Sequence, residues 1–505
     1  MADSTPLLID KKNDQQPELV SIEEDMIEPY ISRFNWPLTL QVVLVSMASF
    51  FEAQQTFITI FTDSKPKWHC IDDGNTSCNS HSNICLLPQT AWSWDKPPRT
   101  STVSEWFLLC NHSPVIPGLP TSAFFMGSLL GGIILSLIGD SIGRKNLLTL
   151  SCLIMSISSI FTAFAKNIWI YSALRTLTGF GRAAIGSCVL VLSTECVGKQ
   201  WRGRIGILGF LSSTMGFLSL PAIAYLTKNY SWRSLYLLTA YPALVYCLCI
   251  PFCVFESPRW LLQQGRQEES VAVISTFISP LDTNDLPKLL SDRNRKVRPF
   301  NTKSLVPSRD RRNQLLILLK NKSTLQRLLL AMVVGFGIGI IYYGMPLSLG
   351  NLDFNLYLSV AFNALLELPS SLMTLYMAKC KRRSTLLTLC ITSGTFGILH
   401  ILAGVLRVLQ IGLELVSFFT ACVAYNLLLI YVVELFPMSS RNSALSAVWQ
   451  AVVFGGALSP AVIAAGGHFN RMLPDAVFGA VVLVIGPLVM LEAEQEQKNE
   501  APYGV

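Results

Sequence analysis

The sequence predicts an all-α membrane protein with 12 transmembrane helices in two six-helix halves. The chain of 505 residues is 51% hydrophobic and only 14% charged. A soluble domain carries about 25% charged residues, so the apolar excess indicates a lipid environment. One long polar interval, residues 256–327, separates two apolar regions and holds 14 Lys and Arg against 7 Asp and Glu.

Each apolar segment is long enough to cross about 30 Å of hydrocarbon at about 1.5 Å per helical residue. The expected spans are residues 38–61, 118–138, 147–165, 168–196, 205–227 and 234–255 in the first half, and 328–346, 354–378, 385–406, 411–436, 443–465 and 475–491 in the second. The expected domains are an N-terminal tail (1–37), a first bundle (38–255), a central loop (256–327), a second bundle (328–491) and a C-terminal tail (492–505).

Basic residues in the short loops predict the orientation of the chain. Cytosolic loops of membrane proteins are enriched in Lys and Arg. The loop residues that fall on one side of the predicted spans are Arg144, Lys145, Lys199, Arg202, Arg204, Lys379, Lys381, Arg382 and Arg383. We therefore expect that side, both termini and the central loop to be cytosolic. The net charge of +7 follows from this topology and does not indicate a nucleic-acid partner.

The long loop on the opposite side, residues 62–117, has the features of a luminal or extracellular segment. It holds Cys70, Cys78, Cys85 and Cys110, which predict two disulfides with three possible pairings. Sequons at Asn75 and Asn111 predict glycosylation in the same loop.

Two sequence motifs in the first half point to a transporter. Ser136-Leu-Ile-Gly-Asp140-Ser-Ile-Gly143-Arg144-Lys145 resembles the G-x-x-x-D-R-x-G-R-R/K loop of the major facilitator superfamily, with Ser136 and Ser141 departing from it. Arg175-Thr-Leu-Thr-Gly-Phe-Gly181 is similar to the superfamily's R-x-x-x-G-x-G element. We expect Asp140 near a helix N-terminus, a tight turn at Gly143, and a gate ion pair between Glu195 and loop arginines.

The stretch Glu256-Ser-Pro-Arg259-Trp-Leu-Leu262 is the most specific local signal. With it, the chain resembles the organic cation/carnitine transporters of the major facilitator superfamily, and their plant branch best. Further matching stretches include Ala53–Phe57, Phe61–Asp63, Trp68–Cys70, Ser104–Phe107, Tyr342–Gly344, Glu367–Pro369, Tyr431–Pro437 with Arg441-Asn442, and Gly455–Pro460. The resemblance and the motifs together suggest gating roles for Asp140, Arg144, Arg175, Glu195, Glu256, Arg259, Glu434 and Arg441.

Ionisable residues inside spans are costly and are candidates for function. Glu52, Arg182 and Glu367 lie within spans, and Glu414 lies nearer a span end. Glu367 has three open roles: cation contact, proton coupling or a structural hydrogen bond. Arg182 pairs internally with Glu52 or Glu367, holds a substrate carboxylate, or extends toward the membrane surface.

Other polar positions complete the candidate site. Glu52 forms a polar stripe with Gln55 and Thr56 that either lines a cavity or packs against another helix. Aromatic faces attract organic cations, and Tyr342, Tyr343 and Tyr425 supply such faces. The candidate substrate-binding set is therefore Glu52, Arg182, Tyr342, Tyr343, Glu367 and Tyr425. Animal members of the resembled family often have an Asp or Arg at the position of Val453. Because Val453 is neutral, this position does not indicate whether the protein selects cations or anions.

These features predict a secondary active transporter of organic cations or zwitterions that works by alternating access. Membrane potential or protons are the candidate driving forces. A transporter of sugars or other polar solutes and a non-transporting receptor remain as alternatives. No spacing typical of an enzyme, a metal site or a cofactor site is present. Asp3-Ser-Thr-Pro-Leu7-Leu8 fits an acidic dileucine sorting signal and favours the vacuolar membrane over the plasma membrane.

Overall fold

A computed structural model gives the structure of the protein. It describes residues 35–71, 78, 84–110, 113, 115–198, 200–277, 322–351, 355–377, 381–402, 406–436, 441–469 and 473–488. The sequons at Asn75 and Asn111 and the dileucine motif lie outside these residues, and so do the side chains of Asp140 and Arg441.

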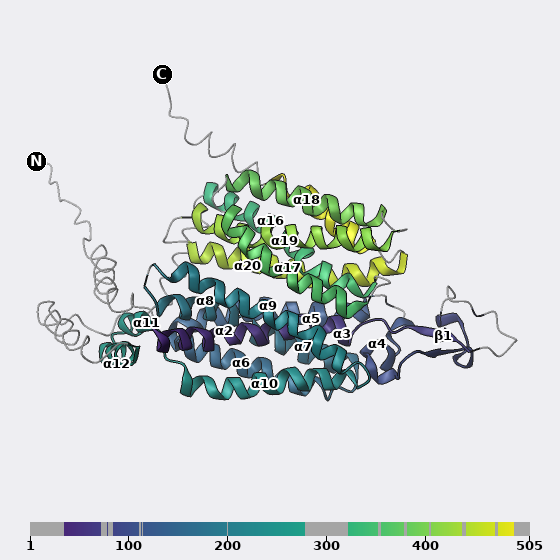
Figure 1. Cartoon of the computed structure of the whole chain (residues 1–505), viewed down its shortest axis with the longest axis horizontal. Helices are drawn as coiled ribbons and strands as arrows, with labels where there is room; N and C mark the ends of the chain where they lie inside the picture. Colours follow the sequence, from purple (N-terminus) through teal and green to yellow (C-terminus); the bar gives the residue numbers. More distant parts are fainter. Residues whose placement is uncertain are drawn as a thin grey trace, which may run out of the picture.

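The first half is a bundle of long helices that runs from the N-terminal to the central region of the chain (Figure 1). Its helices are α2 (Trp36–Phe57), α3 (Thr59–Thr62), α5 (Leu119–Ile142), α6 (Arg144–Thr162), α7 (Ile168–Arg182), α8 (Ile185–Glu195), α9 (Arg202–Leu226) and α10 (Trp232–Cys253). The short helices α11 (Pro258–Gln263) and α12 (Gln267–Phe277) follow at one end of the bundle.

The second half lies alongside the first as a separate bundle (Figure 1). It contains α16 (Lys322–Ser348), α17 (Leu356–Met377), α18 (Arg382–Leu402), α19 (Arg407–Leu435), α20 (Arg441–Phe469) and α21 (Leu473–Ile485). The two halves meet where α20 packs against α5 and α17 packs against α9. This arrangement confirms the predicted all-α fold of two helical halves.

A small loop domain covers the end of the molecule opposite to α11 and α12, and we call this end the hairpin end (Figure 1). Strand β1 (Trp68–Cys70) pairs antiparallel with β2 (Trp92–Trp94), with Trp68 opposite Trp94 and Cys70 opposite Trp92. The short helix α4 (Thr102–Glu105) and several single 3₁₀ turns connect the hairpin to α5.

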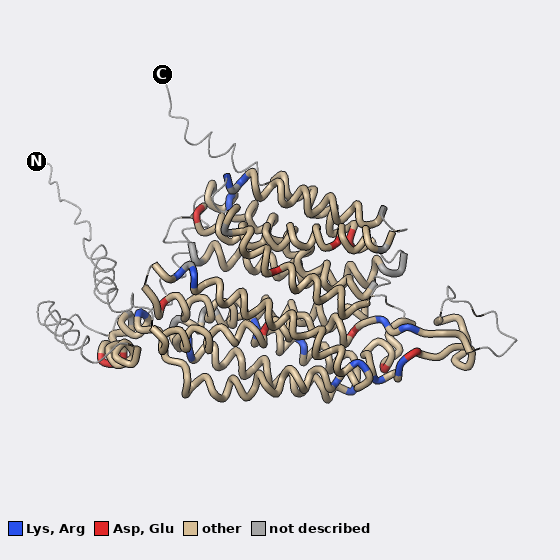
Figure 2. The backbone as a smooth tube through the Cα atoms, viewed as in Figure 1, with Lys and Arg blue, Asp and Glu red and all other residues tan. Residues whose placement is uncertain are grey.

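Eleven helices in the described part of the chain are long and apolar enough to span a membrane, and α21 is a shorter apolar helix of 13 residues. The chain is thus a multi-pass membrane protein. Charged residues are sparse along the helices and gather toward their two ends (Figure 2).

Several predicted boundaries differ from the structure by a few residues, and two of the differences have a physical explanation. The fourth span is interrupted between α7 and α8, at Ala183 and Ala184, although the hydropathy is continuous there. The seventh helix begins at Lys322 and not at residue 328. Its first turn is polar, so hydropathy alone assigned that turn to the central loop.

Close backbone contacts explain the glycines of the seventh helix. A Cβ on Gly339 would overlap the carbonyl group of Val452 in α20, and one on Gly335 would lie 3.2 Å from Val448. Small residues allow transmembrane helices to approach closely. The glycine pattern therefore serves helix packing.

Candidate functional site

Glu52 and Arg182 form an ion pair in the middle of the first half. The Arg182 Nε donates to Glu52 Oε1 at 2.5 Å, and the side chains are only 7% and 13% exposed for Arg182 and Glu52. Among the alternatives that the sequence left open for Arg182, the structure has the internal ion pair with Glu52. Because the two charges compensate each other, the pair is locally neutral.

Arg182 also reaches the second half of the molecule. Its Nη2 donates to the Tyr343 hydroxyl at 3.4 Å, and its Nη1 lies 3.5 Å from the Ser128 hydroxyl. Tyr343 belongs to α16, whereas Arg182 ends α7. The contact therefore crosses between the two bundles.

Glu367 lies buried in α17 and makes a second contact between the halves. Its Oε1 accepts a hydrogen bond from Tyr342 at 3.0 Å, and its Oε2 accepts one from Thr214 in α9 at 3.0 Å. Among the described residues, no Lys or Arg forms an ion pair with Glu367. The carboxylate is thus held only by two neutral hydroxyl groups.

An aromatic group borders the Glu367 carboxylate. The rings of Tyr342 and Tyr425 stack with centroids 4.8 Å apart, and Trp449 lies edge-on to Tyr425 at 6.0 Å. Tyr343 packs at 4.9 Å from Tyr342 and at 4.7 Å from Phe125 of the first half. The structure thus brings the sequence-predicted residues Tyr342, Tyr343, Glu367 and Tyr425 to one place.

The polar stripe of the first helix turns inward within its own half. Gln55 is fully buried, donates to Thr239 at 3.1 Å and accepts from Ser159 at 2.7 Å. Thr56 donates to the backbone carbonyl of Glu52 at 2.9 Å. The sequence left two roles open for this stripe, and the contacts of Gln55 are those of a side chain packed between helices.

A second group of candidates meets at the end of the first half that lies near α11. Glu256 accepts backbone hydrogen bonds from Arg144 and Lys145, both at 3.1 Å, and so caps the N-terminus of α6. A carboxylate at a helix N-terminus interacts favourably with the helix dipole. Among the described side chains Glu256 makes these contacts; the side chain of Asp140, which the sequence predicts near a helix N-terminus, lies outside the described residues.

Gly143 is required at the turn before α6. Its φ of +99° is unfavourable for other residues, and a Cβ there would overlap the Glu256 carboxylate. Arg144 also lies 3.9 Å from Glu195 at the end of α8, and Arg259 donates to the Val197 carbonyl at 3.2 Å. These contacts join the α5–α6 turn, α8 and α11.

The remaining candidate gating residues lie elsewhere. Arg175 is fully buried within the first half, with its guanidinium 4.2 Å from the centroid of the Phe124 ring. It lies 20 residues before Glu195 along the fourth span (195 − 175 = 20). Glu434 is the second-last residue of α19, and Arg441 is the first residue of α20.

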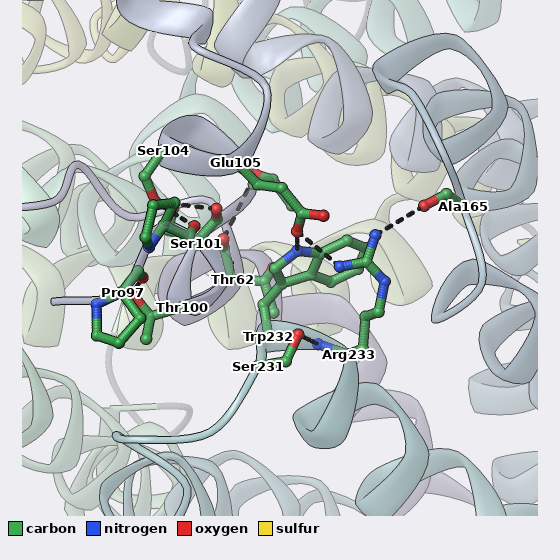
Figure 3. A network of polar contacts seen from close by, with 12 residues as sticks. Thr62, Pro97, Thr100, Ser101, Ser104, Glu105, Ala165, Ser231, Trp232 and Arg233 are labelled. Carbon is green, nitrogen blue, oxygen red and sulfur yellow. Dashed lines mark hydrogen bonds and ion pairs between the residues drawn. The ribbon is translucent and has the colours of Figure 1, made fainter. Parts of the chain in front are cut away.

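The loop domain is attached firmly to the first half. Cys70 is bonded to Cys78, and Cys85 to Cys110. Figure 3 shows Glu105 accepting from Trp232 Nε1 at 2.7 Å and from Arg233 Nη1 at 2.6 Å, while Arg233 donates to the Ala165 carbonyl at 3.0 Å. These bonds fix α4 to the start of α10.

Sequence reasoning missed a polar network at the hairpin end. Asp63, which follows the first span, accepts from Thr102 at 2.8 Å and from Tyr171 at 2.9 Å, and Tyr171 contacts Tyr236 at 2.8 Å. Burial raises the pKa of Asp63 to about 6. Thr214 was also missed, because a lone threonine in an apolar span carries no distinguishing pattern.

The fold and the central site, with two helical halves that share buried polar contacts, define a transporter of the major facilitator type. The model of the Major Facilitator Superfamily matches residues 105–460. A solved structure of the proton:xylose symporter XylE bound to 6-bromo-6-deoxy-D-glucose has a TM-score of 0.63 at 15% identity, covering 91% of this chain and 95% of that one. This likeness concerns the fold alone.

Two plant proteins are much closer in sequence. The Arabidopsis thaliana organic cation/carnitine transporter 3 is 49% identical, over 97% of this chain and 94% of its own length. Organic cation/carnitine transporter 2 of the same plant is 45% identical, over 96% and 93%. The chain belongs to the organic cation/carnitine transporter family of the major facilitator superfamily, and it is a transporter and not an enzyme.

Proposed function

We propose that this protein carries small organic cations, or zwitterions with a cationic group, by alternating access. The observation that carries the proposal is the buried Glu367 carboxylate, which lies between the two halves and has no described cationic partner. A buried carboxylate is costly without a compensating positive charge. A substrate ammonium group would supply that charge.

Aromatic rings beside Glu367 support the same class of substrate. An uncovered aromatic face contributes about 0.5–2 kcal/mol to the binding of a cation. Because Tyr342 and Tyr425 stack on each other, a cation beside Glu367 would contact only a ring face that is turned out of this stack. The neutral Glu52–Arg182 pair adds no net charge, so Glu367 determines the sign of the site. A neutral sugar would leave that charge uncompensated, which makes a cation the better fit.

Contacts that cross the interface support the proposal of alternating access. Thr214 to Glu367 and Arg182 to Tyr343 join the halves near the centre. At the hairpin end, Phe61 stacks on Tyr357 of the other half at 5.6 Å. A substrate that replaces Thr214 at Glu367 changes one of these contacts. Binding would thereby be linked to the relative position of the halves.

Ligand binding to the purified protein tests the site. Tetraethylammonium, choline, carnitine and polyamines should each be titrated against wild type, Glu367→Gln and Glu269→Gln, the last being an exposed carboxylate control. Loss of cation binding in Glu367→Gln alone supports the proposal. Equal binding by wild type and Glu367→Gln would contradict it.

Arg182 supports a narrower proposal for zwitterions. Its guanidinium is engaged by Glu52 in this structure, and a substrate carboxylate would compete for it. Arg182→Ala should then weaken binding of carnitine more than that of tetraethylammonium. An equal loss of affinity for both ligands would mean that Arg182 stabilises the site and does not bind the substrate carboxylate.

We also propose that the protein resides in the vacuolar membrane. The motif Asp3-Ser-Thr-Pro-Leu7-Leu8 supports this location. A tagged Leu7→Ala/Leu8→Ala variant should move to another membrane in plant cells. An unchanged location would show that Leu7 and Leu8 do not direct the protein to its membrane.

A further inference from the structure

Four helices of the second half place polar side chains together toward the hairpin end. Asn363 of α17 donates from its Nδ2 to Glu414 of α19 at 3.4 Å. His400 of α18 has its Nδ1 3.6 Å from an oxygen of Asp475 of α21. We call Asn363, His400, Glu414 and Asp475 the four-helix cluster. It is distinct from the central site.

The four-helix cluster is sealed inside the second half. Each of its four residues is at most 2% exposed. Helix α18 packs closely against both α19 and α21. A Cβ on Gly479 of α21 would lie 2.6 Å from the Gly394 carbonyl of α18, so the two glycines allow the approach that brings His400 beside Asp475.

Several polar atoms of the cluster have no hydrogen-bond partner among the described residues. They are Asn363 Oδ1, Glu414 Oε1, Asp475 Oδ1 and both ring nitrogens of His400. Leaving such a group buried without a hydrogen-bond partner is energetically unfavourable. The cluster therefore has the capacity to bind something that satisfies these atoms.

The charges of the cluster are also uncompensated. Within the described part of the chain, no Lys or Arg pairs with Glu414 or Asp475, and the only basic group beside them is His400. Ser348 of α16 lies near Asp475, and its hydroxyl donates to the Met345 carbonyl at 2.9 Å. Two buried carboxylates near each other require a positive charge.

A proton fits this arrangement better than a metal ion. The described residues contain no group of three or more His, Cys, Asp or Glu side chains placed to hold a metal. A proton needs only one carboxylate oxygen, which becomes a hydrogen-bond donor to its neighbour. Glu414 and Asp475 each have one oxygen that makes no hydrogen bond.

The cluster lies close to the central site along α17. Asn363 and Glu367 are four residues apart, so they share one face of the helix and are separated by about 6 Å along its axis. Asn363 contacts Glu414, and Glu367 contacts Tyr342 and Thr214. A change of charge at the cluster would thus act within one helical turn of the substrate carboxylate.

We propose that the four-helix cluster is a proton-binding site of the second half, separate from Glu367, and that it holds the proton that drives transport. A carboxylate of Glu414 or Asp475 takes up one proton from water and releases it again during the transport cycle, which requires the packing that seals the cluster to open transiently. The coupling role rests on the proposed transport function, whereas proton binding does not.

Infrared difference spectra of the full-length protein in lipid, taken between acidic and alkaline buffer, test proton binding directly. Protonated carboxyl groups give a carbonyl stretch that ionised groups lack. We expect Glu414→Gln or Asp475→Asn to lose one such band, and Glu367→Gln to leave that band in place. Ser417→Ala is the matched control, because Ser417 is buried in α19 with its hydrogen bond to Ser393 satisfied.

Unchanged carboxyl bands in both Glu414→Gln and Asp475→Asn would overturn the proposal. A band that responds to sodium at constant pH would also overturn it, in favour of a metal ion. Should these variants fail to fold, Glu414→Asp retains the carboxyl group, and its band should shift in frequency and not disappear. An unshifted band in that variant would argue against Glu414.

Transport by the same variants tests the coupling role. In proteoliposomes, Glu414→Gln should lose the stimulation of cation uptake by a pH gradient but retain uptake driven by membrane potential. Intact stimulation would refute coupling through the cluster. Absence of uptake in wild type would refute the proposed function instead, and the infrared result would still decide whether the cluster binds a proton.

Discussion

Breaking the Glu52–Arg182 pair should destabilise the first half strongly. In Glu52→Gln the Arg182 guanidinium, which is 7% exposed, loses its buried counter-charge and keeps only neutral hydrogen-bond partners, Tyr343 at 3.4 Å and Ser128 at 3.5 Å among them. Removing one partner of a buried ion pair costs about 3–5 kcal/mol. Replacing both partners costs much less, because no unpaired charge stays behind.

The size of the effect can be expressed as a melting temperature. An unfolding entropy of about 2.1 cal/mol/K per residue over 505 residues is about 1 kcal/mol/K. Glu52→Gln and Arg182→Met should therefore each lower the melting temperature by about 3–5 °C. The double variant should lie closer to wild type than either single variant.

Thermal unfolding of the four proteins in one detergent measures this cycle. Glu269→Gln is the control, because it breaks an exposed pair with Arg266 that is worth about 0–1 kcal/mol. Additive losses in the double variant would mean that Glu52 and Arg182 are not energetically coupled. That result would refute the assignment of the pair.

Three further predictions follow from the hairpin end and the helix contacts. Burial raises the pKa of Asp63 from 3.8 to about 6. Its contribution of about 3 kcal/mol to the free energy of unfolding is therefore present below about pH 4 and is lost as the pH rises through about 6. The stability of Asp63→Asn, measured across this range, should lack that loss, and stability curves parallel to those of wild type would contradict the assignment. Glu105→Gln leaves Arg233 without its carboxylate and should increase proteolysis of the loop domain, whereas Glu269→Gln should not. Gly339→Leu would collide with the Val452 backbone and should prevent folding, while Gly412→Leu, with open space at its Cβ position, should be tolerated, as expression and gel filtration would report.

The sequence was sufficient for the fold because each span carries its own hydropathy signal. The two-half arrangement and the family resemblance both depend on such local patterns. The interruption between α7 and α8 was missed, since Ala183 and Ala184 are apolar and no proline marks the break, although Gly181 and Gly186 flank it.

The site was only partly predictable. Glu52, Arg182 and Glu367 stand out because charges are rare within spans. Their partners depend on how helices distant in sequence are packed: Thr214 lies 153 residues before Glu367, and Glu52 lies 130 residues before Arg182. Pairing of that kind has no local signature.

The four-helix cluster illustrates the same limit. His400 is a single histidine in an apolar helix, and Asp475 begins the last short helix. Neither residue suggests the other in the sequence. Only the packing of α18 against α21 places them 3.6 Å apart.

Uptake of radiolabelled cations into proteoliposomes tests the central claim most directly. Tetraethylammonium, choline, carnitine and polyamines should be offered to wild type and to Glu367→Gln under imposed voltage and pH gradients. We expect wild type to accumulate at least one of these cations and Glu367→Gln to accumulate none. No uptake of any cation by wild type under either gradient would contradict the claim that this protein is an organic cation carrier.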